Sequence, residues 1–337
     1  MKHLAVLLIL CVSLTACESP EAQEEAEAAA APRAEWAIAI HGGAGVISKD
    51  IEGERKKEYF DALEAALTLG RDMLDRGDKG LDVVEAVIRQ LENTPLFNAG
   101  KGAVFTHEGT HELDSAIMDG STLGCGAVAG LTSIKNPITL ARHVMEDSEH
   151  VFMLGAGAER FADEMGVERV DQDYYFDAYR HEQWQKALQE DAEEGEEKYG
   201  TVGCVVLDRD GNLTAGTSTG GMTNKRFGRV GDVPVIGAGT YANNRSVAVS
   251  GTGWGEKFIK NAVAHDISAL VEYRGLSVRE AAETVIHQKL DPGDGGVIAV
   301  GRDGSIALVY NSKGMFRGAA DSTGRFEVAI WEAGVGP

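Results

Sequence analysis

The stretch that decides the fold runs from Gly200 to Lys225 and reads GTVGCVVLDRDGNLTAGTSTGGMTNK. Its first part, Val202 to Leu207, is an apolar strand, and Asp210-Gly211 then supplies the turn of a β-hairpin. Leu213 to Ser218 forms the returning strand, and a loop rich in glycine and hydroxyl groups follows it. The stretch therefore predicts a buried hairpin whose ends carry small polar side chains.

The segment before this hairpin has the opposite character. Between residues 190 and 197 it carries a run of acidic side chains, and few large apolar residues follow Leu188. Such a run contributes little to a core. We expect residues 182–200, approximately, to be an acidic linker, so that Thr201 lies where a solvated segment meets a core strand.

A threonine in that place has a specific chemical use. Once it is the first residue of a chain, its own α-amino group, with an ordinary pKa of roughly 7.7 to 8, can accept the hydroxyl proton near neutral pH. A glycine before the cut bond, here Gly200, permits the strained backbone of an N-to-O acyl shift. The residues alone leave a second interpretation open, an ordinary loop that leads into an ordinary strand.

The rest of the chain interleaves strands and helices without an internal repeat. Alternating and helical hydrophobic patterns predict one α+β domain in which helices cover stacked sheets. The predicted strands are 36–40, 103–106, 112–118, 125–131, 247–251, 296–300, 305–310 and 326–331. The predicted helices are 59–74, 81–91, a helix that begins at Asn136-Pro137 as N-cap and first-turn proline, 255–273 and 277–290.

The N-terminus indicates export. Lys2 and His3 precede an apolar run from Leu4 to Leu14, as in a signal peptide of residues 1–17. The run is too short to be a comfortable membrane span. Leu14-Thr15-Ala16-Cys17 is similar to a bacterial lipobox, which implies lipid attachment at Cys17 and, with Glu18 next to it, a lipoprotein on the periplasmic side of the outer membrane. The alternative is an ordinary cleaved signal peptide in which the cysteine is incidental. Residues 18–34 are expected to be a flexible tether.

Charge and cysteine content exclude several classes of protein. A net charge of −21 argues against nucleic acid and anionic lipid surfaces as partners, so membrane contact is expected only through a lipid anchor. Only Cys125 and Cys204 lie in the globular part, which excludes a disulfide scaffold. Both lie in apolar runs, and we interpret them as two small buried thiols, although an oxidising compartment would allow them to pair.

Two enzyme motifs occur by letter but lack their structural context. His107-Glu108-Gly109-Thr110-His111 matches the H-E-x-x-H zinc motif, which requires a helix, yet predicted strands surround it. Residues 216–220 match G-x-S-x-G, whose serine needs a helix after it, yet a polar loop follows. We therefore reject both a zinc protease and a serine hydrolase.

The motifs across the chain resemble those of the plant-type asparaginase and isoaspartyl peptidase family of N-terminal nucleophile hydrolases. The resemblance spans about residues 36–320 and keeps the family order. It is carried by HGGAG at 41–45, PLFNAG at 95–100, LD at 113–114, MDG at 118–120, TVG at 201–203, DGNL at 210–213, TSTGGMTNK at 217–225, GRVGD at 228–232, GAG at 237–239, YAN at 241–243, SGTG at 250–253 and GE at 255–256. It implies a four-layer αββα sandwich, cut before Thr201 into an α subunit of residues 35–200 and a β subunit of residues 201–337.

The resemblance also implies a role for each matching residue. Thr201 is the expected nucleophile, with Thr219 and Thr252 hydrogen-bonded around it and with the Thr252 hydroxyl and Gly253 amide as the oxyanion hole. Guanidinium geometry suits a carboxylate, so Arg229 is expected to bind the substrate α-carboxylate and Asp232 the α-ammonium. The remaining residues expected around the substrate are Gly253, Gly255 and Asn98, and His41-Gly42-Gly43 is expected to approach the nucleophile strand.

The same family implies no cofactor for catalysis, one structural sodium ion and a homodimer of cleaved αβ protomers. The expected sodium ligands are the main-chain carbonyls of Leu91, Glu92, Thr94, Phe97, Ala99 and Lys101. Lys101 fits this site only if its ammonium group points away from the ion. Trp254 departs from the family pattern, since relatives more often carry a small or polar residue there, and a narrower pocket for the leaving group would be the consequence.

The expected reaction is therefore hydrolysis of β-aspartyl dipeptides and L-asparagine. Hydrolysis of N4-glycosylasparagine, which would use the same nucleophile and zwitterion clamp, remains as an alternative. The second alternative is a lipid-anchored binding protein of the same fold without activity. Against it, catalysis requires the residue types found at Thr201, Thr219, Arg229, Asp232 and Thr252.

Overall fold

The predicted hairpin lies at the centre of a large sheet. β5 (Val202–Leu207) and β6 (Leu213–Thr219) pair antiparallel, with Val202 opposite Ser218. The computed structural model describes residues 33–45, 47, 53–189 and 200–331. Within them the eight strands of this sheet follow the order β12-β11-β1-β5-β6-β2-β3-β4, and four more strands form a sheet in the order β10-β9-β8-β7.

The neighbours of the hairpin come from distant parts of the chain. β1 (Ala37–Gly45) pairs with β5 on one side, and β2 (Leu113–Asp119) pairs with β6 on the other. The other strands are β3 (Cys125–Leu131), β4 (Phe152–Leu154), β7 (Thr240–Ala242), β8 (Val247–Gly253), β9 (Gly295–Gly301), β10 (Ile306–Tyr310), β11 (Gly314–Asp321) and β12 (Phe326–Ala329).

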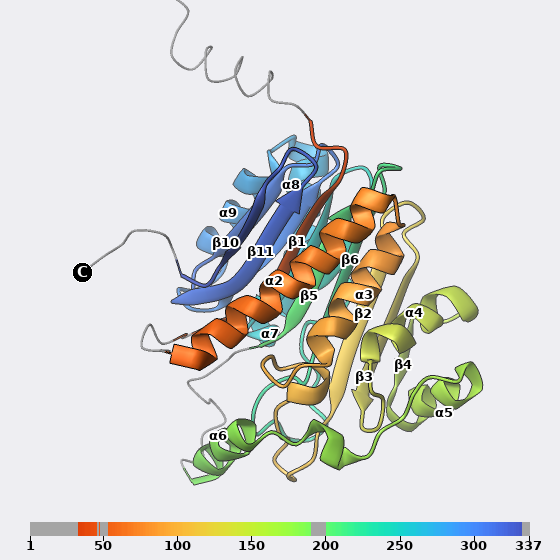
Figure 1. Ribbon diagram of the computed structural model, residues 1–337, viewed down its shortest axis with the longest axis vertical. Coiled ribbons are helices and arrows are strands. Elements are labelled where there is room, and N and C mark those ends of the chain that lie inside the picture. Colours follow the sequence, from red (N-terminus) through yellow and green to blue (C-terminus); the bar gives the residue numbers. More distant parts are fainter. Residues whose placement is uncertain (1–32, 46, 48–52, 190–199, 332–337) are drawn as a thin grey trace, which may run out of the picture. The chain divides into compact units, whose positions relative to one another are not determined.

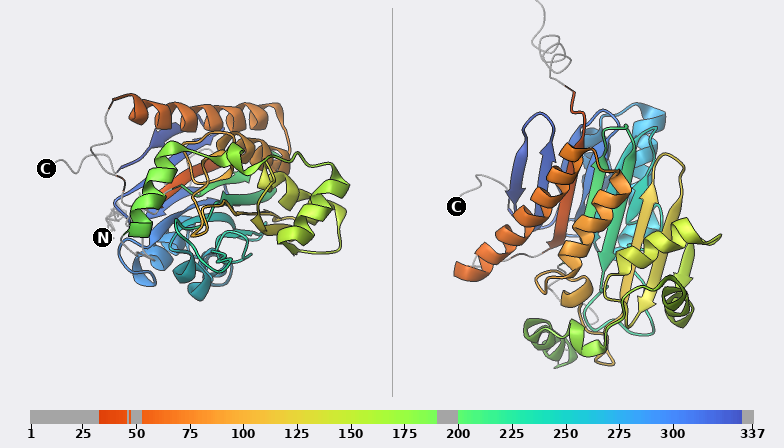
Figure 2. Two further views of the ribbon diagram at one scale, coloured as in Figure 1. Left: turned by 90° about the horizontal axis from the view of Figure 1, so that it is seen from below. Right: turned by 45° about the vertical axis from the view of Figure 1, so that its right-hand side comes forward.

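Helices cover the outer faces of both sheets, so the domain has four layers. α2 (Gly53–Arg76), α3 (Gly80–Glu92) and α4 (Pro137–Asp147) pack on the large sheet, and α8 (Val263–Arg274) and α9 (Val278–Gln288) pack on the small one (Figures 1 and 2). The inner faces of the sheets meet through β1, β5, β6, β8 and β9. The α+β αββα sandwich predicted from the sequence is confirmed.

Each interface between layers has its own apolar core. Val84, Val87, Ile88 and Leu91 of α3 recur at helical spacing and are fully buried against the large sheet. A second cluster joins α8 and α9 to the small sheet, and a third, rich in alanine, lies between the sheets. Small side chains in the middle layer allow the two sheets to approach closely, and this brings the ends of β5, β6 and β8 together.

Most predicted elements are present, and the differences have local causes. Residues 103–106 form no strand, because the 3-10 turn η1 (Gly100–Gly102) precedes them and only Thr106 makes an isolated bridge, to Lys225. The predicted helix 255–273 is two helices, α7 (Gly255–Asn261) and α8, because Ala262 adopts a left-handed φ of 46°.

Other differences concern helix ends and short elements. Asn136 precedes α4 but makes no side-chain cap, since its Nδ2 donates to Glu92 instead. The predicted linker begins too early, because α6 (Ala178–Gln189) is helical through residue 189. The prediction also lacked β4, β7, β11, α5 (Gly155–Met165) and the 3-10 turn η2 (Gln172–Tyr175). These strands are short or rich in glycine and small residues, so their hydrophobic pattern is weak.

Some predictions lie outside the described residues. These are the signal peptide 1–17 with Cys17, the tether up to residue 32, and the acidic run 190–199. Across the described ranges, none of the helices is both long and apolar enough to cross a membrane. Cys125 and Cys204 are both free; Cys204 is buried, whereas Cys125 is only partly buried.

Candidate active site

Three threonines from three strand ends line one cavity. Thr201 lies directly before β5, Thr219 ends β6, and Thr252 lies near the end of β8 in the other sheet. The antiparallel register of β5 and β6 places the Thr201 and Thr219 hydroxyl oxygens 3.1 Å apart. The cavity is lined by Ala44, Asn98, Val104, Gly200, Thr201, Thr219, Gly221, Met222, Thr223, Arg229, Gly231, Asp232, Val233, Thr252 and Gly253.

A chain of neutral hydrogen bonds lies behind Thr201. His41 of β1 contacts the Thr201 carbonyl oxygen through Nδ1 at 2.9 Å and the Ser250 hydroxyl through Nε2 at 2.9 Å. Ser250 in turn meets Thr217, which meets Thr240, each at 2.7 Å. Because a carbonyl only accepts, we assign the proton to Nδ1, and the Ser250 hydroxyl donates to Nε2.

Burial keeps this imidazole neutral. His41 is completely buried, and loss of solvation lowers its pKa to about 3, although the hydrogen bond with Thr201 opposes the shift. It therefore carries no charge near neutral pH. The imidazole orients the carbonyl of the residue expected to be the nucleophile, and its hydrogen bonds go to Thr201 O and Ser250 rather than to the Thr201 hydroxyl.

The backbone around the Gly200–Thr201 bond is crowded. Gly43 and Gly200 have φ values of 114° and 121°, which favour glycine. A Cβ on Gly43 would overlap the Gly200 nitrogen, and a Cβ on Gly200 would overlap Asn98. The close approach of β1 to Gly200 thus depends on a glycine in each segment. In the continuous chain the Thr201 nitrogen belongs to a peptide bond, so it becomes a base only after that bond is cut.

Thr252 and Gly253 form the wall of the cavity contributed by the small sheet. The Ala44 amide donates to the Thr252 hydroxyl oxygen at 3.1 Å, so the hydroxyl proton can point into the cavity. Gly253 has a φ of 156°, and a Cβ there would overlap the Asp294 carbonyl. A hydroxyl and an adjacent backbone amide on the same wall are suitable donors to a developing oxyanion.

Charged side chains also line the cavity. Arg229 and Asp232 both line the cavity, from the loop after β6. Asp232 is fully buried, and burial raises its pKa to about 7 against the opposing effect of Arg229. Among the described residues no hydrogen-bond partner reaches its Oδ2. An ammonium group in the cavity would supply the missing counter-charge.

The sequence did not indicate the partner of Arg229. Its Nε and Nη2 donate to the two carboxylate oxygens of Glu256, each at 2.9 Å. Glu256 is in the first turn of α7 and is not part of the cavity wall. Gly255 also lies outside the wall; a Cβ on it would be 2.7 Å from Arg229 Nη2 and 3.0 Å from Asp232 Oδ1. Gly255 therefore makes room for the charged pair rather than contacting the cavity itself.

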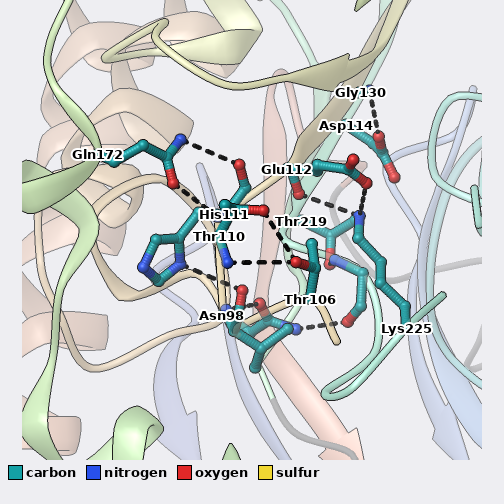
Figure 3. Close-up of polar contacts among 12 residues, drawn as sticks. Asn98, Thr106, Thr110, His111, Glu112, Asp114, Gly130, Gln172, Thr219 and Lys225 are labelled. Atoms are coloured by element: carbon teal, nitrogen blue, oxygen red, sulfur yellow. Dashed lines mark hydrogen bonds and ion pairs between the residues drawn. The ribbon is translucent and has the colours of Figure 1, made fainter. Parts of the chain in front are cut away.

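Asn98 connects two loops at the edge of the cavity. Its Nδ2 donates to the Gly221 carbonyl at 2.7 Å and its Oδ1 accepts from the Val104 amide at 3.0 Å. Figure 3 shows this bridge beside Thr219 and Lys225. The Gly221 amide donates to the Thr219 hydroxyl oxygen at 3.1 Å, so Asn98 braces the loop that positions Thr219.

Lys225 anchors the other end of that loop. Its side chain is only 1% exposed, and its ammonium group contacts Glu112 through the carbonyl at 3.1 Å and the carboxylate at 3.5 Å (Figure 3). Asp114, fully buried nearby, accepts from the Gly130 amide, and burial raises its pKa while Lys225 opposes the shift. The sequence signal that could have found this network is a lysine in the polar loop that follows a core strand, and the sequence prediction did not use it.

The two rejected motifs have other structural roles. Residues 107–111 form a turn with Gly109 at a φ of 78°, and His107 and His111 bond to Asn224 and to the Val104 carbonyl. Ser218 lies within β6 and donates to the buried carboxylate of Glu92 at 2.7 Å. Within the described part of the chain, no three His, Cys, Asp or Glu side chains gather at one point that could hold a metal ion.

The loop expected to bind sodium offers main-chain oxygens. A Cβ on Gly100 would overlap the Glu92 carbonyl, and one on Gly102 would overlap the Phe97 carbonyl. The two glycines therefore let carbonyl oxygens gather around η1, and such oxygens suit a hard cation. Lys101 points its ammonium group to the Tyr174 ring, 5.7 Å from the centroid. The residues of this loop thus fit a structural alkali ion.

Comparison with known proteins decides the family. The asparaginase family model matches residues 34–330. This chain belongs to the asparaginase family. It is 52% identical to an isoaspartyl peptidase of Escherichia coli over 292 residues, which cover 83% of this chain and 91% of the relative.

Relatives in other kingdoms are also similar. A probable isoaspartyl peptidase/L-asparaginase 2 of Arabidopsis thaliana is 45% identical, with 88% of this chain and 99% of the relative covered. A plant-type L-asparaginase of Pyrococcus furiosus is 40% identical, with 83% and 94% covered.

Proposed function

We propose that this protein cuts itself before Thr201 and then hydrolyses β-aspartyl dipeptides and L-asparagine. The observation that carries the proposal is the convergence, in one cavity, of the Thr201 hydroxyl, the Thr252–Gly253 wall and the Arg229–Asp232 pair. A β-aspartyl group has a carbonyl to be attacked and a free α-carboxylate and α-ammonium to be held. Each of these groups has a matching partner in the cavity.

The reaction begins when the new α-amino group of Thr201 accepts the hydroxyl proton. The hydroxyl oxygen attacks the substrate side-chain carbonyl, and the developing oxyanion accepts from Thr252 and Gly253, each donor being worth roughly 3 to 4 kcal/mol. The amide C–N bond then breaks, and the proton goes to the leaving amine. Water attacks the threonine ester, which releases aspartate and restores the hydroxyl.

Denaturing gel electrophoresis with N-terminal sequencing tests the self-cleavage. The wild-type protein is expected to give two fragments, the second of which begins at Thr201, and Thr201→Ala one uncut, inactive chain. Assays with a β-aspartyl dipeptide, L-asparagine and a glycosylated asparagine then rank the substrates. A fully active uncut chain, or an active Thr201→Ala variant, would contradict the proposal.

We infer a structural sodium ion held by the main-chain carbonyls of the loop 91–101. The ion would add a counter-charge to the oxygens that gather around η1, and would thereby hold Asn98 beside Gly221. The protein in potassium-free and sodium-free buffer is expected to melt at a lower temperature and to regain stability on addition of sodium. An unchanged melting temperature would remove the ion from the proposal.

We also propose export and lipid attachment at Cys17. Support comes from the apolar run of residues 4–14 and the lipobox-like residues 14–17. Expression of the full chain in a Gram-negative host, followed by membrane fractionation, tests this. Wild type is expected in the membrane fraction and Cys17→Ser in soluble form; equal distribution of both would contradict lipid attachment.

We propose a homodimer of cleaved αβ protomers as the working assembly. The family resemblance over most of the chain supports it. Light scattering of the cleaved protein is expected to give twice the protomer mass, and a protomer mass at micromolar concentration would contradict it.

A further inference from the structure

The guanidinium group of Arg229 can form two carboxylate forks. One edge presents Nε and Nη2, and the other presents Nη1 and the second proton of Nη2. Glu256 occupies the first edge with two bonds of 2.9 Å. A Cβ on Gly231, which lines the cavity, would lie 2.9 Å from Nη1. The second edge is thus the one beside the cavity wall.

Glu256 is itself held in place. It lies in the first turn of α7, its side chain is partly buried, and it accepts a hydrogen bond from the Trp254 side chain. Burial alone would raise its pKa, but the bonds from Arg229 and Trp254 keep the pKa below its usual range, so Glu256 is charged at neutral pH. Trp254 is anchored by its own amide, which donates to the Asp294 carbonyl at 2.7 Å.

The sequence led us to expect that Trp254 narrows the pocket for the leaving group, but its ring has other contacts. It does not line the cavity; its face lies 5.7 Å from the Lys257 ammonium, and its side chain bonds to Glu256. Trp254, Glu256 and Arg229 form a relay of hydrogen bonds that ends at the cavity. A departure from the family pattern thus connects to the group expected to bind substrate.

We propose that Glu256 is a positioning residue that orients Arg229 for the substrate α-carboxylate, and that Trp254 orients Glu256. The inference rests on the proposed function, since it takes Arg229 as the carboxylate-binding group. A fork accepts a carboxylate with two parallel bonds only when its plane is aligned, and an arginine side chain that is not already held loses rotamer freedom on binding. Glu256 would restrict this freedom before the substrate arrives.

Kinetics of the cleaved Glu256→Gln enzyme with L-asparagine and a β-aspartyl dipeptide test the proposal. We expect KM to rise about tenfold with kcat changed by less than about twofold, because the lost alignment affects binding of a remote group. Glu283→Gln, which removes an exposed ion-paired carboxylate on α9, is the matched control and is expected to leave KM unchanged. A KM for Glu256→Gln that is unchanged would overturn the proposal, and a lower KM would show that Glu256 competes with the substrate for Arg229.

A substrate without the α-carboxylate separates positioning from general damage. β-Alaninamide keeps the ammonium and the amide but lacks the carboxylate. Its kcat/KM is expected to be equal in wild type and Glu256→Gln, whereas a parallel loss on this substrate would mean a structural effect and overturn the proposal. If wild type turns over none of the substrates, the proposed function fails instead of this inference.

Trp254→Phe gives a second, milder variant. It keeps an aromatic ring but removes the indole N–H. We expect KM for L-asparagine to rise about threefold, and the double variant with Glu256→Gln to be no worse than Glu256→Gln alone, since both act through one relay. Additive effects of the two substitutions would exclude a relay and leave Trp254 without this role.

Discussion

The polar groups around Thr201 form two sets that differ in charge. Behind its carbonyl lies a neutral chain of an imidazole and hydroxyl groups that begins at His41 and includes Ser250. On the cavity wall lie ionisable groups, the buried Asp232 and Arg229, which is paired with Glu256. The neutral side contacts the Thr201 carbonyl, in the peptide unit after the proposed cleavage site, and the charged side is the one proposed to bind the substrate. We infer that the first serves self-cleavage and stability and the second serves substrate binding.

The largest effect is expected on the cleavage side, from Gly43→Ala. The added Cβ would overlap the Gly200 nitrogen, and the φ of 114° disfavours alanine. We expect self-cleavage to be lost, measured as fragment formation on a denaturing gel. Gly77→Ala is the control, since its φ of 87° is also positive but nothing lies within 4 Å of the added Cβ. Normal cleavage of Gly43→Ala would break the comparison.

The next effect is expected on the substrate side, from Arg229→Ala. Loss of two charge-assisted hydrogen bonds to the substrate is expected to raise KM about 100-fold. Self-cleavage is expected to proceed, because Arg229 belongs to the charged side. Arg279→Ala, which removes an exposed arginine paired with Glu283, is the control. An uncut Arg229→Ala chain would show that the two sides are not separate.

A smaller effect is expected from Ser250→Ala in the neutral chain. The substitution leaves His41 Nε2 and Thr217 without their buried partner, which is expected to lower the free energy of unfolding by about 3 kcal/mol. Denaturant unfolding in the uncut Thr201→Ala background measures this without interference from cleavage. Ser121→Ala, which changes an exposed serine, is expected to cost far less. Equal costs for both would mean that the network is not stabilising.

The smallest effect concerns pH and the carboxyl of Glu92, which accepts from Ser218 behind β6. Burial raises the pKa of Glu92 from 4.5 to about 7, against the opposing hydrogen bonds. The folded state therefore binds the Glu92 proton more tightly than the unfolded state does. The stability that the protonated Glu92 carboxyl contributes is complete below pH 4.5 and is lost as pH rises through 7. Between pH 5 and 7 we expect wild type to lose about 2 kcal/mol more stability than Glu92→Gln.

Thermal melts of both proteins at these pH values measure the difference. Asp232 acts in the same direction in both proteins, since its pKa is also raised to about 7. His41 acts oppositely: its pKa is lowered to about 3, so its contribution is lost as pH falls below 6.5. Both effects are common to the two proteins and cancel in the comparison. Parallel pH curves would show that Glu92 is ionised in the fold at neutral pH.

Much of the layered fold could be predicted from local patterns. Alternation and helical spacing located the hairpin of β5 and β6 and the helix α3 within one or two residues. The patterns failed at β4, which has three residues, and at Ala262, where a left-handed residue breaks a continuous helical pattern. Short elements and single backbone exceptions depend on tertiary packing, and periodicity does not record them.

By itself the sequence determined which residue types are available and the motifs from which the nucleophile and clamp residues are predicted. Only the tertiary structure decided their neighbours: that Ser218 faces Glu92 while Thr219 meets Thr201, that Ser250 reaches His41, and that Glu256 takes one edge of Arg229. The physical reason is that these contacts join strands and loops far apart in the chain. They depend on strand register and on how closely two sheets pack, and no local pattern of side chains encodes either.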